Sequence, residues 1–71
     1  MVLHEFSIRG FKSLEQAMSI LSPLKLYGVE THGRSLILCM VEPDDLANFF
    51  ISVSAIEAFG GNQLLSVNYT V

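Results

Sequence analysis

The sequence predicts a single α+β domain over residues 1–71, in which four antiparallel strands form one sheet and two helices cover one of its faces. Two stretches with the pattern strand, helix, strand follow one another along the chain. The run from Leu36 to Val41 is apolar at both alternating positions, which is typical of a central strand. With 71 residues, 51% of them hydrophobic, the chain can build one small core.

The first half contains a strand followed by a short helix. Residues Val2 to Arg9 alternate between apolar and polar side chains, which predicts a strand with one face on the core. Ser13 stands three residues before Gln16, a spacing that predicts a capped helix start after Gly10. Pro23 ends this helix. Its apolar side chains recur at helical spacing and form one stripe: Leu14, Ala17, Met18 and Leu21.

A hairpin is predicted in the middle of the chain. Residues Leu26 to His32 form the weakest strand pattern and are expected at an edge of the sheet. The stretch His32-Gly33-Arg34-Ser35 supplies a glycine for the positive φ angle that a tight turn needs. It therefore joins the edge strand antiparallel to the central strand.

The second half ends with another helix and strand. Pro43 is suited to a first helical position, and Glu42, Asp44 and Asp45 place carboxylates where the helix dipole favours them. Gly60-Gly61 marks the end of the helix, and Leu64 to Val71 alternates as a last strand. The buried stripe expected for this helix is Leu46, Phe49, Phe50, Val53, Ile56 and Phe59.

Right-handed crossovers in both halves give the ferredoxin-like βαββαβ arrangement, with the first and third strands in the middle. The helix-covered face is expected to bury Val2, Phe6, Ile8, Leu14, Met18, Leu21, Phe49, Phe50, Val53, Val67 and Tyr69. The opposite face is left open and is the candidate binding surface. It should display Leu3, Glu5, Ser7 and Arg9 of the first strand and Leu36, Leu38 and Met40 of the third.

The composition argues against nucleic acid as a partner, against a membrane span and against secretion. The four basic residues are scattered and the net charge is −3, so nucleic acid is not an expected partner, whereas a cationic ligand or peptide suits the acidic balance. Polar residues interrupt every apolar stretch, so we expect no membrane span, no secretory signal and a cytoplasmic location. The single cysteine, Cys39, is expected to be a small buried hydrophobe.

No catalytic or metal-binding pattern is present in the sequence. His4 and His32 have no third ligand at a metal-site spacing, and neither is tied to a nucleophile. Gly10 and Gly60-Gly61 lack the glycine spacing and lysine of a phosphate-binding loop. We therefore expect no enzyme activity, no metal and no cofactor.

Three stretches resemble the NapD family: Tyr27-Gly28-Val29-Glu30-Thr31-His32 entering a hairpin, Leu36 to Glu42 before an acidic helix start, and Leu65-Ser66-Val67-Asn68-Tyr69. Members of that family are small cytoplasmic chaperones that assist maturation of periplasmic nitrate reductase. They bind the twin-arginine signal peptide of its catalytic subunit until the molybdenum cofactor is loaded. The resemblance implies that such a peptide lies on the open face, with its apolar flank on Leu3, Leu36, Leu38 and Met40 and its arginines near Glu5, Glu30 or other carboxylates.

A second class of function stays open. A regulatory or assembly module of the ACT-like type pairs with itself through sheet faces or edge strands and binds a small ligand or a partner protein, and Gly10 suits a ligand site of that type. A homodimer is the state that this alternative implies.

Overall fold

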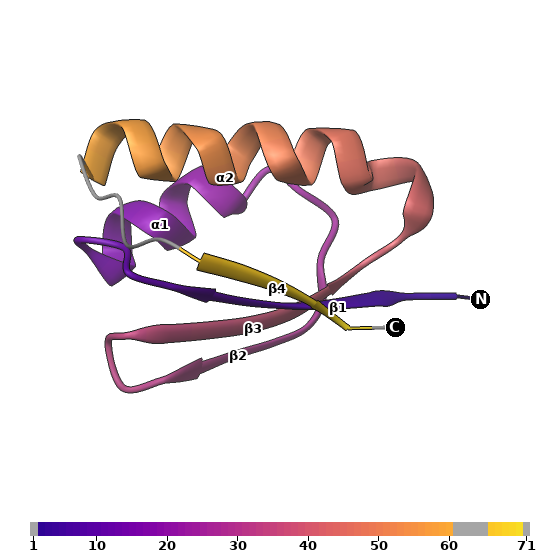
Figure 1. Cartoon of the computed structure of the whole chain (residues 1–71), viewed down its shortest axis with the longest axis horizontal. Coiled ribbons are helices and arrows are strands. Elements are labelled where there is room, and N and C mark those ends of the chain that lie inside the picture. The colour runs from indigo at the N-terminus through magenta and orange to yellow at the C-terminus, as the bar shows by residue number, and fades with distance from the viewer. Residues whose placement is uncertain (1, 61–65, 71) are drawn as a thin grey trace.

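The computed structural model describes residues 2–60 and the backbone of residues 66–70. The elements follow the order β1 (His4–Arg9), α1 (Leu14–Leu21), β2 (Tyr27–His32), β3 (Leu36–Val41), the 3₁₀ turn η1 (Pro43–Asp45), α2 (Leu46–Gly60) and β4 (Ser66–Thr70). All strand pairs are antiparallel, and the order across the sheet is β2-β3-β1-β4. Both helices lie on the same side of the sheet (Figure 1).

The fold class predicted from the sequence is corrected to a small α+β fold. Where backbone and side chains are both described, the protein consists of a three-stranded antiparallel sheet, β2-β3-β1, and two helices. β4 is described only as backbone that pairs with β1, and the side chains expected to complete a four-stranded ferredoxin-like sandwich, Val67 and Tyr69, lie outside the described residues. The described core draws its strand residues from β1 and β3 alone.

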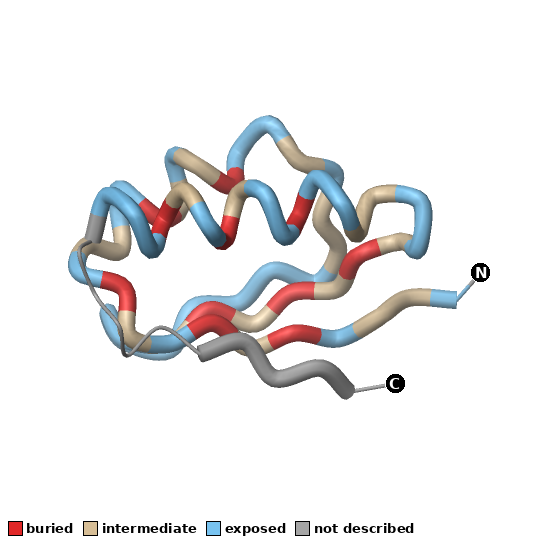
Figure 2. The backbone as a smooth tube through the Cα atoms, turned by 45° about the horizontal axis from the view of Figure 1, so that its top comes forward, coloured by how far each residue is buried: buried red, intermediate tan, exposed pale blue. Residues whose placement is uncertain are grey.

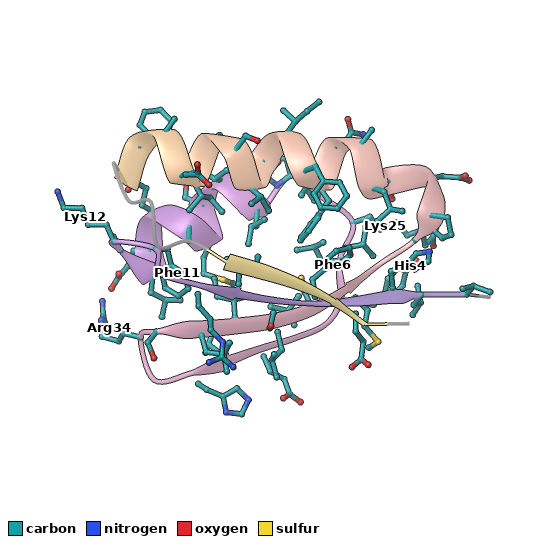
Figure 3. The ribbon with its side chains drawn as sticks, in the orientation of Figure 1. His4, Phe6, Phe11, Lys12, Lys25 and Arg34 are labelled. Atoms are coloured by element: carbon teal, nitrogen blue, oxygen red, sulfur yellow. The ribbon has the colours of Figure 1, made fainter. Side chains whose placement is uncertain are left out.

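The core lies between the helices and the sheet, where the buried segments of the tube face one another in Figure 2. Phe6 packs against Phe49 of α2 with 4.4 Å between ring centroids, and Figure 3 shows Phe6 between β1 and that helix. The alternation of β3 agrees with its expected central position, because its odd-numbered residues are buried and its even-numbered residues are half-buried. The buried residues are Phe6, Ile8, Phe11, Ala17, Leu21, Ile37, Cys39, Val41, Phe49, Val53 and Ile56.

Several core expectations were wrong. Val2 is 62% exposed because it precedes β1, and Phe59 is 68% exposed near the end of α2. Phe50 is partly exposed, although its ring still meets Phe6 edge-on at 5.6 Å. Phe11, which the periodicity did not predict, is buried directly after Gly10, whose φ of 82° turns the chain toward the core.

The start of α1 and the turn of the hairpin lie where the local sequence pattern predicted them. The Gln16 backbone amide donates to Ser13 Oγ at 3.2 Å, as the spacing predicts for a helix cap. Gly33 has a φ of 61° in the turn between β2 and β3. Arg34, next in the turn, forms an ion pair with Glu15 of α1 and so ties the tip of the hairpin to the helix layer.

Candidate functional site

The open face of the sheet carries a shallow hollow of about 400 Å³. It lies over the middle of β1, β2 and β3, on the side away from the helices, where strand side chains project in Figure 3. Its described lining residues are Glu5, Phe6, Ser7, Arg9, Gly28, Glu30, Leu38, Cys39 and Met40.

Strand register arranges the open-face side chains in three rows across the sheet, because directly opposed residues point to the same face. The first row contains Tyr27, Met40 and Glu5. The second row contains Glu30, Leu38 and Ser7, and the third contains His32, Leu36 and Arg9. Each row therefore has an apolar β3 residue in the middle and polar or aromatic residues on the flanking strands.

Five of the seven site residues expected from the sequence line the hollow: Glu5, Ser7, Glu30, Leu38 and Met40. Leu3 precedes β1 and Leu36 begins β3, and neither is among the lining residues. Both Leu36 and Leu3 are half-buried rather than sealed in the core. The hollow therefore covers the middle of the expected surface and does not reach Leu3 or Leu36.

Gly28 is a lining residue that the sequence interpretation missed. It has a φ of 57° and sits where the pairing of β2 with β3 is irregular, between Tyr27 and Glu30. A Cβ atom at this position would lie 2.5 Å from Met40 Cε, so the missing side chain lets Met40 lie over the β2 backbone. A lone glycine inside a strand pattern is the signal that could have indicated this close approach.

Glu30 contacts its neighbour on the same strand, with His32 Nε2 3.4 Å from Glu30 Oε2. Both side chains are more than half exposed, so the contact is a surface ion pair only when the imidazole is protonated. Glu30 therefore keeps its carboxylate in solvent at the β2 side of the hollow.

A second polar cluster joins the start of β2 to the end of β3. The Tyr27 hydroxyl donates to Glu42 Oε1 at 2.6 Å, and Lys25 Nζ lies 3.7 Å from the same oxygen. The pKa of the exposed Lys25 is raised first by its side-chain interaction with Tyr27 and then by the negative charge of Glu42. The side chain of Glu42, expected to serve the helix start, makes no cap hydrogen bond there and binds Tyr27 instead.

The cysteine behaves as the sequence predicts. Cys39 is 2% exposed, and burial raises the pKa of its thiol to about 11. At neutral pH the thiolate is therefore scarce, although Cys39 is among the residues that line the hollow.

The structure describes the side chains of residues 2–59. There, no group of three or more His, Cys, Asp or Glu residues is placed to hold a metal ion. Within the same residues, neither helix has the length and apolar character needed to cross a bilayer.

Comparisons with protein-family models, with curated proteins and with solved structures find no match to this chain.

Proposed function

We propose that this protein is a non-catalytic binding domain that holds a segment of another protein on the open face of its sheet. The class of segment proposed is a twin-arginine signal peptide of a redox-enzyme precursor such as periplasmic nitrate reductase, held in the cytoplasm before export. The domain would then act as a maturation chaperone.

The observation that carries this proposal is the hollow with an apolar floor and acidic sides. Leu38 and Met40 are half-buried on the floor, while Glu5 and Glu30 flank it from β1 and β2. An apolar floor favours burial of apolar side chains of a bound segment, and carboxylates on both sides favour guanidinium groups, which they can bind through paired hydrogen bonds.

The size of the hollow favours a narrow occupant. A volume of about 400 Å³ lies within the range of sites that hold small ligands or a few side chains. Two copies stacked through this face would bring two hollows together, and a void of that kind loses packing contacts. A segment that protrudes into the hollow avoids this loss.

The test is a fluorescence-anisotropy titration with a labelled twin-arginine signal peptide. Wild-type protein is expected to bind, and Leu38→Asp is expected to lose binding at least roughly tenfold because a charge replaces the apolar floor. A peptide with both arginines replaced by alanine should bind correspondingly weakly. Equal binding of the two peptides would refute the twin-arginine assignment.

Ile51→Asp is the matched control, because Ile51 is 68% exposed on α2, and that helix lies on the opposite side of the sheet from the open face (Figure 1). This variant should bind like wild type. Thermal unfolding followed by circular dichroism must show a cooperative transition for both variants. Unfolding of Leu38→Asp alone would place Leu38 in the core and remove the surface on which the proposal depends.

Self-association is the second candidate function, and exposed apolar side chains on α2 favour it. Phe50, Ile51 and Phe59 are 46%, 68% and 68% exposed, and large apolar side chains on the surface are potential contacts for a second copy. Sedimentation velocity distinguishes the candidates: a dimer that Ile51→Asp dissociates, in a protein that does not bind the peptide, would favour the assembly module.

A further inference from the structure

Opposite charges on the open face are separated along β1. Glu5 lies in the first row and Arg9 in the third, four residues apart on the same face. At about 3.3 Å of rise per residue, their backbone positions are ~13 Å apart. This separation of the backbone positions exceeds the screening length of about 8 Å at physiological ionic strength, which weakens the interaction between the two charges.

Glu30 adds a second carboxylate to this face, on β2. It lies in the second row on β2, two strands away from Arg9 and one row along, which gives a separation of ~12 Å between backbone positions. His32 shares the third row with Arg9. Glu5 in the first row and Arg9 in the third therefore lie at opposite ends of the hollow, and Leu38 lies in the row between them.

We propose that this face selects a segment that carries a basic group and an acidic group on opposite sides of an apolar centre. The basic group lies over Glu5 and Glu30, and the acidic group lies over Arg9. This inference depends on the proposed function, since it specifies the charge order of the segment bound there. In extended form, about four residues separate the two charged groups.

The charge order distinguishes this occupant from a purely basic peptide. A segment with basic groups at both ends meets an unfavourable like charge at Arg9, whereas a segment with acidic groups at both ends meets Glu5 and Glu30. A second copy of the chain, stacked with its rows reversed, would also pair these charges. The void between two opposed hollows would lose packing contacts, which disfavours that arrangement.

The experiment uses three capped eight-residue peptides with the same four-residue apolar centre. One has two arginines before it and two aspartates after it, one has arginines on both sides, and one has aspartates on both sides. Isothermal titration of the wild-type protein should give the tightest binding for the mixed peptide, by roughly fivefold over the doubly basic one. Arg9→Glu should reverse this preference in favour of the doubly basic peptide.

Lys12→Glu is the matched control, because it makes the same change in charge at an exposed residue outside the hollow. It should keep the wild-type ranking. Binding of all three peptides with no preference, or an unchanged ranking in Arg9→Glu, would overturn the charge order while leaving the proposed function intact. If none of the three peptides binds, the proposed function itself is overturned. A concentration-dependent dimer that Arg9→Glu dissociates would identify a second copy as the occupant and overturn the inference.

Discussion

The Tyr27 hydroxyl donates a 2.6 Å hydrogen bond to Glu42 Oε1 and so joins the first residue of β2 to the residue that follows β3. Lys25 approaches the same carboxylate and lies 5.7 Å from the centroid of the Tyr27 ring. The cluster fixes the end of the linker from α1 next to the site where the chain enters α2. The cluster therefore stabilises the edge of the open face at which the first row, with Tyr27, lies.

Tyr27→Phe should lower the free energy of unfolding by about 1 kcal/mol, because the Glu42 carboxylate loses a charge-assisted hydrogen bond at a half-buried position. Urea denaturation followed by circular dichroism measures this change. Glu42→Gln retains an acceptor oxygen and should cost less than Tyr27→Phe. An unchanged denaturation midpoint in Tyr27→Phe would show that solvent replaces the bond without loss.

Gly28→Ala should destabilise the protein more than Gly33→Ala. Both glycines have positive φ angles, so each substitution carries a backbone cost of about 1–2 kcal/mol. Only at Gly28 would the new Cβ meet another atom, Met40 Cε, whereas the space around Gly33 is open. The difference between the two unfolding free energies isolates the contact with Met40.

The same contact is tested by adding Met40→Ala to each glycine variant. Shortening this side chain should relieve the extra cost at Gly28 and leave the backbone cost at both positions. Equal destabilisation by Gly28→Ala and Gly33→Ala would mean that the flexible end of Met40 moves aside freely.

Stability should fall as pH rises above about 9 because of Cys39. Its pKa is raised from 9.0 to about 11 in the folded protein, so the unfolded chain releases this proton first and is favoured between these values. The loss approaches about 3 kcal/mol above pH 11, at about 1.4 kcal/mol for each pKa unit. Urea midpoints measured from pH 7 to 11 should decline less steeply in Cys39→Ala.

Alkylation gives a second measurement on the same thiol. Iodoacetamide at pH 8.5 should modify Cys39 at least roughly a hundredfold more slowly in the native protein than in urea, because burial reduces both the thiolate fraction and access. Equal rates would show that the core around Cys39 opens readily.

Phe49→Ala should cost about 3–5 kcal/mol, since Phe49 is fully buried against Phe6 and its removal leaves a cavity. In a domain of this size that is a large part of the whole stability. Phe59→Ala is the matched control and should change the urea midpoint little, because Phe59 is 68% exposed. A similar cost for both would contradict the assigned core.

The sequence predicted the elements well where short-range chemistry decides them. The Ser13 cap, the Gly33 turn and the doubly apolar β3 all depend on neighbours within a few residues, and the structure confirms each. The fold class was wrong in its detail, because the residues with described side chains form a three-stranded sheet and two helices. Val67 and Tyr69, which the four-stranded sandwich required, lie outside the described residues.

The candidate site was partly predictable for a similar reason. Strand alternation alone predicted that Glu5, Leu38 and Met40 share one face of the sheet. It could not show that the hollow ends before Leu3 and Leu36, or that Gly28 admits Met40, because these depend on register and on an irregular pairing between strands.

The sequence by itself determined where the described strands and helices lie to within a few residues, which face of β3 is buried, and where the chain turns. Tertiary structure alone decided that Glu42 binds Tyr27 rather than serving the helix start, that Phe11 is buried and Phe59 is not, and that Glu5 and Arg9 lie at opposite ends of one hollow. The physical reason is range: propensity and periodicity act over a few residues, whereas register and burial are set by contacts between segments distant along the chain.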